Sequence, residues 1–211
     1  MNLSHLLNAR RAAGKPVRVA LIGAGKFGSM FLSQVPHTPG LEVPVIVDLD
    51  PERAREACRT VGWDAARIAA TTFTADGAKA TSVEIEVIVE ATGNPAVGIK
   101  HARAAIAHRK HIVMVNVEAD VLAGPLLAEE ARKAQVVYSL AYGDQPALTA
   151  EMVDWARATG FRVVAAGKGT KYLPAYHEVT PADVWGHYGL TAGEAQSAGM
   201  NPQMFNSSPI R

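Results

Sequence analysis

Short apolar runs alternate along the chain with longer segments of helical periodicity. The runs lie at residues 17–22, 41–47, 69–72, 87–91, 111–115, 136–140 and 161–166. Several are rich in valine and isoleucine and end at glycine or a polar residue, as buried strands do. Helical spacing is found at residues 3–13, 26–34, 51–61, 95–108, 121–134 and 145–159. Strands that alternate with helices of about ten residues or more predict parallel βαβ units, so we expect an α/β fold with a Rossmann-type, doubly wound parallel sheet.

Three glycines with G-x-G-x-x-G spacing follow the first apolar run. Gly23 permits a tight turn, Gly25 lets the backbone approach a pyrophosphate, and Gly28 lets the next helix pack closely on the strand. The helix that begins with Lys26 and Phe27 then directs its free N–H groups at the diphosphate. These five residues are therefore predicted to bind a dinucleotide.

An acidic residue supports the same interpretation. Asp48 ends the second apolar run, twenty residues after Gly28, where a dinucleotide fold places an acid for the adenosine ribose hydroxyls. Because a carboxylate repels a 2′-phosphate, Asp48 favours NAD over NADP. The alternative is that Asp48 caps the next helix, but Asp50, directly before Pro51, is better placed for that role.

Composition narrows the class of protein. The 211 residues are 48% hydrophobic and 19% charged, which favours a sizeable core over disorder. A net charge of +1 without a basic run argues against nucleic-acid or membrane-surface binding. The single cysteine, Cys58, forms no internal disulfide and is expected to be buried, which fits a reducing cytoplasm.

Five stretches, the first of which includes the start of the glycine motif, form one series. They lie at residues 14–25, 90–95, 113–120, 138–146 and 166–169. Together they resemble the homoserine dehydrogenase-like NAD(P)-dependent oxidoreductases, which include the 1-deoxyxylulose-5-phosphate reductoisomerase-like enzymes and are often found with a C-terminal SAF domain. The resemblance covers roughly residues 10–206.

The resemblance implies a domain order. A leading helix at residues 1–15 precedes an NAD(P)-binding domain at 16–166, and residues 167–211 form part of a substrate and oligomerisation domain. Members of the family act on small molecules, and homo-oligomers through the second domain are implied. Residues 206–211 depart from the family pattern, so we expect a truncated chain.

Two strand ends carry further candidates for cofactor contact. The family's loop after the fourth strand passes the nicotinamide ribose, which assigns Thr92, Gly93 and Asn94 to the cofactor; Asn94 could also cap the helix that begins at Pro95. Asn116, after the fifth strand, occupies a place that resembles the Ala-Asn-Lys motif of true homoserine dehydrogenases. The lysine of that motif is missing here, which argues against homoserine as the substrate.

Three residues are candidates for catalysis. Lys168 stands between two glycines after the last predicted strand, where cofactor charge and burial could tune it as a proton donor or acceptor. Asp144 is its expected partner, and Lys171 is the substitute for Lys168. Glu118 either orients substrate or is a solvated loop acid. The alternative for Lys168 is an ordinary lysine in a flexible turn.

The sequence supports two functional hypotheses. The first is hydride transfer between NAD(P) and a small polar carbonyl or alcohol compound, with or without a phosphate group. The second is a truncated dinucleotide-binding module without turnover. No metal-binding motif is present, and His101, His108 and His111 are interpreted as surface residues.

Overall fold

The computed structural model describes residues 3–142 and 145–167, together with residues 186, 189, 191, 193 and 194. Backbone contacts divide the chain into two compact units, Met1–Trp155 and Ala156–Arg211. The sheet and its flanking helices belong to the first unit. Little of the predicted second domain at 167–211 is described, and Asp144, Lys168 and Lys171 lie outside the described residues.

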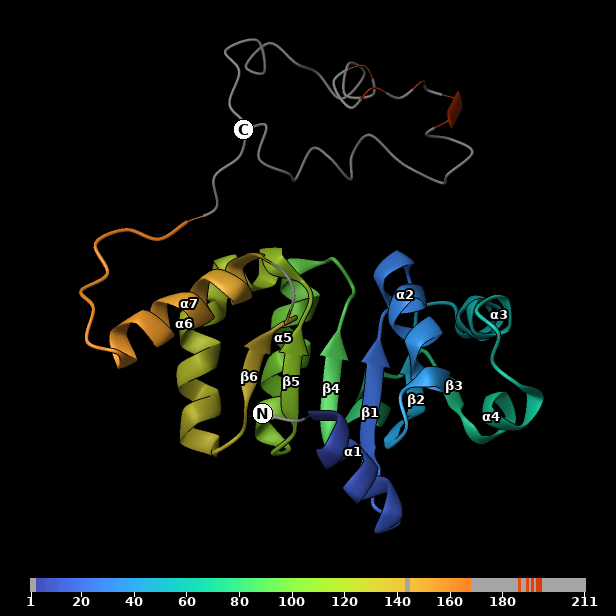
Figure 1. Cartoon of the computed structure of the whole chain (residues 1–211). Coiled ribbons are helices and arrows are strands. Elements are labelled where there is room, and N and C mark those ends of the chain that lie inside the picture. Colours follow the sequence, from blue (N-terminus) through green and yellow to red (C-terminus); the bar gives the residue numbers. More distant parts are fainter. Residues whose placement is uncertain are drawn as a thin grey trace. The chain divides into compact units, whose positions relative to one another are not determined.

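Six parallel strands form one sheet (Figure 1). They are β1 Val17–Ile22, β2 Leu41–Val47, β3 Thr72–Thr74, β4 Val87–Glu90, β5 His111–Met114 and β6 Tyr138–Leu140. Their order is β3-β2-β1-β4-β5-β6, and every neighbouring pair is parallel. The chain reverses its direction of growth between β1 and β4, which is where doubly wound sheets bind their ligands. The predicted fold class is confirmed.

Helices connect the strands. They are α1 Leu3–Ala12, α2 Lys26–Gln34, α3 Pro51–Thr60, α4 Ala65–Ala70, α5 Pro95–Ala107, α6 Val117–Ala134 and α7 Gln145–Ala158, with short 3-10 helices η1 Val35–His37 and η2 Gly77–Thr81. Polar side chains fix where several of them begin. Asp50, Asn94 and Asn116 cap α3, α5 and α6, each accepting a hydrogen bond from a backbone N–H in the first turn.

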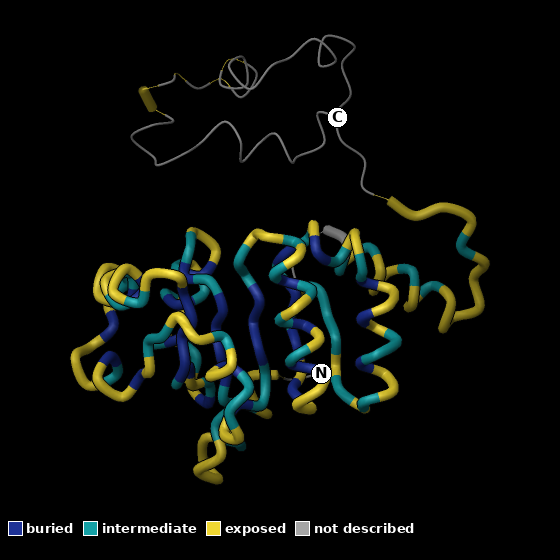
Figure 2. The backbone as a smooth tube through the Cα atoms, turned by 180° about the vertical axis from the view of Figure 1, so that it is seen from behind, coloured by how far each residue is buried: buried dark blue, intermediate teal, exposed yellow. Residues whose placement is uncertain are grey.

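Alternating residues of the central strands supply two cores, one on each face of the sheet. Ala20 and Ile22 of β1 pack into the core beneath α5 and α6, whereas Val19 and Leu21 pack into the core beneath α2 and α3. Figure 2 shows the buried strands between the two layers. A buried leucine or isoleucine side chain contributes about 1.5–3 kcal/mol to stability. These cores hold the strand ends, and hence the loops after them, in fixed positions.

The structure corrects three predicted elements. The strand expected at residues 69–72 is displaced toward the C-terminus, because α4 continues to Ala70 after Asp64 caps it, and β3 begins only at Thr72. Residues 161–166 form no strand. Helix α6 begins at Val117, four residues before the predicted start at 121. Within the described part of the chain, no helix is both long and apolar enough to cross a membrane.

Candidate functional site

Packing requires two of the three motif glycines. Gly23 has a φ of +95°, and a Cβ there would lie 2.7 Å from the carbonyl oxygen of Ala91. A Cβ on Gly28 would overlap the carbonyl oxygen of Gly23. In contrast, a Cβ on Gly25 would have no described atom within 4 Å. Packing therefore does not require a glycine at position 25. The open space beside its backbone fits the close approach of a ligand.

The residues 23–28, which we call the glycine turn, lead directly into α2. Gly25 is the N-cap of α2 and provides no side-chain hydrogen bond, and Lys26 and Phe27 are exposed in the first turn. The first N–H groups of a helix have no acceptor within the helix. An anion at this point would accept hydrogen bonds from them and gain from the helix dipole.

The carboxylate of Asp48 is buried and tied to the glycine turn. Its Oδ2 accepts a hydrogen bond from Ala24 N at 2.8 Å, and its Oδ1 accepts from Asp50 N at 3.0 Å and from Arg53 Nη2 at 2.7 Å. Burial acts to raise the pKa of Asp48, but the hydrogen bonds from Arg53, Asp50 and Ala24 outweigh it and leave the pKa below its usual range. Asp48 therefore stays a carboxylate at the end of β2, as the predicted ribose contact requires.

Arg53 is a site residue that the sequence analysis missed. Its side chain is 60% exposed whereas that of Asp48 is 4% exposed, so the guanidinium is the more accessible group of the pair. A guanidinium near this acid offsets its repulsion of a 2′-phosphate. The NAD preference predicted from Asp48 therefore has an opposing charge beside it. The signal available in the sequence was an arginine in the first turn of the helix after Asp48.

A second loop, residues 91–94, follows β4 and is called the β4–α5 loop. Asn94 Oδ1 accepts a hydrogen bond from Val97 N at 3.1 Å, so its predicted capping role is confirmed. The backbone oxygen of Asn94 accepts from Asn116 Nδ2 at 2.9 Å. Between Thr92 and Asn94, Gly93 is exposed with a φ of +71°. Asn116 is 3% exposed and braces this loop from α6.

The last residue of β4 is a buried acid that the sequence analysis did not single out. Glu90 is 0% exposed. Its Oε1 accepts from Thr92 Oγ1 at 2.6 Å and lies 3.2 Å from His101 Nδ1. The prediction that His101 is a surface residue is wrong, because its ring contacts this buried carboxylate. An acid that ends an otherwise apolar strand was the signal in the sequence.

The candidate catalytic residues are not brought together by the described structure. Glu118 is exposed in the first turn of α6, so the expectation that it lies in a loop is corrected: the cap from Asn116 starts the helix before it. Asp144 and Lys168 stay predictions. Among the residues that the structure describes, no group of three or more histidine, cysteine, aspartate or glutamate side chains could hold a metal ion.

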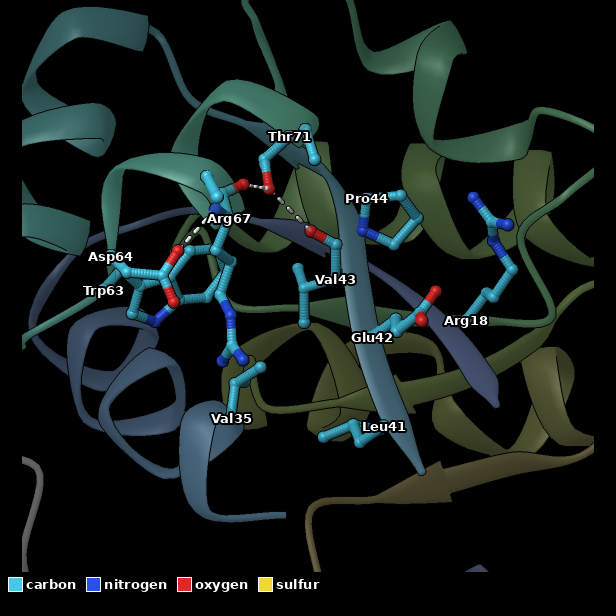
Figure 3. A pocket seen from close by; sticks show the side chains of 12 residues that line it. Arg18, Val35, Leu41, Glu42, Val43, Pro44, Trp63, Asp64, Arg67 and Thr71 are labelled. Atoms are coloured by element: carbon cyan, nitrogen blue, oxygen red, sulfur yellow. Dashed lines mark hydrogen bonds between the residues drawn. The ribbon is translucent and has the colours of Figure 1, made fainter. Parts of the chain in front are cut away.

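One pocket lies at the amino ends of β1 and β2, away from the glycine turn (Figure 3). It is lined by the first residues of β2, by Arg18 at the start of β1, and by Trp63, Arg67 and Thr71 around α4. Trp63 is buried there and donates a hydrogen bond from Nε1 to the Leu32 carbonyl oxygen at 2.8 Å. Ligands of doubly wound sheets bind at the carboxyl ends of the strands, so this pocket is not the candidate cofactor site.

The fold and the glycine turn together define a dinucleotide-binding α/β domain. Residues 17–142 match the family model described as an oxidoreductase family with an NAD-binding Rossmann fold, and the chain belongs to that family. Residues 143–208 match a model described as the catalytic domain of the oxidoreductase DRL.

Solved structures share the fold at low sequence identity. A homoserine dehydrogenase from Thiobacillus denitrificans is 20% identical with a TM-score of 0.51, over 60% of this chain and 29% of its own. A putative oxidoreductase from Bacillus subtilis is 19% identical with a TM-score of 0.51, over 69% and 41%. A myo-inositol dehydrogenase from Lactobacillus casei, in complex with NAD(H) and myo-inositol, is 17% identical with a TM-score of 0.51, over 67% and 42%.

These three structures support the fold alone. The matched region spans less than half the length of each of the three proteins. A comparison with curated proteins gave no match.

Proposed function

We propose that this chain binds a nicotinamide dinucleotide at the carboxyl ends of β1, β2 and β4 and transfers hydride to or from it. The single observation that carries the proposal is the contrast within the glycine turn. Gly23 and Gly28 are needed for packing, whereas Gly25 faces open space at the N-terminus of α2. Membership of the NAD-binding oxidoreductase family supports the same assignment.

In the proposed complex, each end of the cofactor has its own loop. The N–H groups of Lys26 and Phe27, at the start of α2, would hold the diphosphate at Gly25. The adenosine ribose lies beside Asp48, and the nicotinamide ribose lies against the β4–α5 loop, at Thr92–Asn94. Asn116 acts on the cofactor through its hydrogen bond to the Asn94 carbonyl oxygen.

The proposed reaction is oxidation or reduction at a small polar alcohol or carbonyl compound, with or without a phosphate group. In the reducing direction, the bound nicotinamide would supply hydride to the carbonyl carbon, and the carbonyl oxygen would take a proton. Lys168 is proposed as the proton donor, with Asp144 and Glu118 as orienting acids. The match of residues 143–208 to the catalytic domain of the oxidoreductase DRL supports a catalytic role for this segment.

NAD is proposed as the preferred cofactor, with a narrow margin. The buried Asp48 carboxylate disfavours a 2′-phosphate, while the exposed guanidinium of Arg53, 2.7 Å from it, favours one. The two effects oppose each other at one place, so the chain is expected to bind both cofactors and to bind NADH more tightly.

Calorimetric titration of the chain with NADH and with NADPH tests the binding part of this proposal. We expect one site per chain and a lower Kd for NADH. Gly25→Ala should weaken binding of both cofactors by about tenfold or more, since hydrogen bonds to a charged group are lost. Absence of binding to either cofactor would contradict the proposal.

Lys168→Ala tests the catalytic part, and Lys171→Ala tests the substitute candidate. Oxidation of NADH is followed by absorbance with a panel of small oxo and hydroxy compounds. We expect Lys168→Ala to abolish turnover and to leave the Kd for NADH within a few-fold, while Lys171→Ala retains turnover. Binding of NADH without turnover by the unmodified chain would favour the alternative, a dinucleotide-binding module.

A further inference from the structure

Two buried polar side chains hold the β4–α5 loop at its two ends. Glu90 Oε1 accepts the hydroxyl hydrogen of Thr92 at 2.6 Å, and Asn116 Nδ2 donates to the Asn94 carbonyl oxygen at 2.9 Å. Only Gly93 lies between these two anchors. It is exposed and has a φ of +71°, so the loop presents a fixed backbone apex rather than a side chain.

Packing alone does not explain an acid at position 90. Glu90 is 0% exposed and lies on the same face of β4 as Ile88. The core on this face also contains Ala102 and Ala105 of α5. A buried carboxylate is costly unless it is paired and hydrogen-bonded. Glu90 lies at the carboxyl end of β4, next to β1, where the order of the strands reverses. The free-energy cost of burying its carboxylate is therefore paid at the proposed cofactor site.

The space around the carboxylate is also specialised. A Cβ on Gly98 would lie 3.1 Å from Glu90 Oε2 and 2.8 Å from Asn116 Nδ2. The glycine therefore leaves room for both side chains beneath α5. Glu90 Oε2 is buried and has no hydrogen-bond partner among the described residues, whereas Oε1 takes both Thr92 Oγ1 and the His101 ring. The acid is thus committed to the loop through one oxygen.

We propose that Glu90 is a positioning residue for cofactor binding, which fixes the β4–α5 loop through Thr92 and is itself held by His101. The inference rests on the proposed function, because it assumes that this loop meets the nicotinamide half of the cofactor. Fixing the loop before binding reduces the entropy lost on binding. The effect acts on the nicotinamide half only, since the adenosine and diphosphate groups meet the glycine turn and Asp48.

Calorimetric titration with two ligands, NADH and ADP, separates this role from general stability. Thr92→Val removes the hydroxyl at nearly constant volume, and Thr92→Ser retains it. We expect Thr92→Val to weaken NADH binding by about threefold to tenfold, the loss of one hydrogen bond, and to leave the Kd for ADP unchanged. Thr92→Ser should restore NADH binding to near the original value. Thr60→Val, which removes an exposed hydroxyl at the end of α3, is the matched control.

A double-variant cycle assigns the effect to Glu90. If Glu90 acts through Thr92, then Glu90→Gln and Thr92→Val together should weaken NADH binding less than the product of their separate effects. Independent, multiplicative effects would overturn the proposal, as would equal loss of NADH and ADP affinity in Thr92→Val. If the unmodified chain binds ADP but not NADH, or neither, the proposed function fails instead, so the two failures are distinguishable.

Discussion

The loops after β1 and β4 lie on the two sides of the switch point, the place between these strands where the sheet reverses its direction of growth. The two loops are held in position by different means. After β1, the chain turns because side chains are absent: Gly23 and Gly28 leave no room for a Cβ against neighbouring backbone. After β4, the loop is held because buried polar side chains are present, with Glu90 on Thr92 and Asn116 on the Asn94 carbonyl oxygen. One side depends on steric fit and the other on a hydrogen-bond network.

This difference determines how each side should respond to mutation. A Cβ that meets backbone cannot be accommodated by rotating a side chain. Substitutions in the glycine turn should therefore lower the stability strongly. A network of side chains can lose one member and relax. Substitutions around Glu90 should therefore have smaller, graded effects on stability.

Gly28→Ala should give the largest effect. The added Cβ would overlap the backbone oxygen of Gly23, so α2 must move away from β1, and the free energy of unfolding should fall by about 2–3 kcal/mol. Urea denaturation followed by circular dichroism measures this. Gly25→Ala is the control within the same turn. Its Cβ meets open space, and it should lower stability by less than about 1 kcal/mol; equal losses in the two variants would refute the division of roles among the glycines.

Gly98→Ala tests the other side of the switch point. Its Cβ would meet the side chains of Asn116 and Glu90 rather than backbone, so we expect a loss of about 1–2 kcal/mol in the free energy of unfolding. The loss should shrink when Gly98→Ala is made in an Asn116→Ala background, because the 2.8 Å approach to Asn116 Nδ2 is then absent. Additive losses in the double variant would show that the crowding lies elsewhere.

Asp48, the acid beside the glycine turn, should make the stability of the fold depend on pH. Hydrogen bonds from Arg53 and from the N–H groups of Asp50 and Ala24 hold the pKa of Asp48 below its usual range despite burial. The ionised group therefore stabilises the fold above the unfolded-state pKa of about 4, and this contribution is lost as the pH falls through the lower folded-state pKa. Asp48→Asn should flatten the fall in unfolding free energy below about pH 4. Asp154→Asn, at an exposed position of α7, is the control; an unchanged slope in Asp48→Asn would contradict the expectation.

The smallest effect is expected for Arg53→Met. Removing the exposed guanidinium leaves the Asp48 carboxylate to repel a 2′-phosphate, so NADPH binding should weaken about twofold to fivefold relative to NADH. Competition titration with the two cofactors measures this ratio. Arg59→Met, at the far end of α3 where Arg59 pairs with Glu56, should leave the ratio unchanged. If Arg53→Met strengthens NADPH binding, the guanidinium does not face the 2′ position.

Local sequence was enough to predict the glycine turn. The strand at 17–22, the three glycines and the helix at 26–34 are contiguous, and the structure gives β1 and α2 with those bounds. The caps by Asp50 and Asn94 were also predictable, since each acts within three residues of itself. Here the physical cause and its effect lie in the same short stretch.

Features that depend on distant packing were missed. Glu90 and His101 meet only because β4 and α5 pack together, and nothing in their spacing distinguishes His101 from an exposed histidine. Apolar residues at 65–70 fit a strand or a helix, and the cap from Asp64 decides for the helix. The apolar run at 161–166 forms no strand, because an apolar run alone does not decide between strand and irregular structure.

We propose that the glycine turn binds the diphosphate of a nicotinamide dinucleotide. Titration of the unmodified chain and of Gly25→Ala with NADH, with the free energy of unfolding measured for both, tests it most directly. We expect one NADH site, which Gly25→Ala weakens by about tenfold or more at nearly unchanged stability. NADH binding that Gly25→Ala leaves intact, or no binding by the unmodified chain, would contradict it.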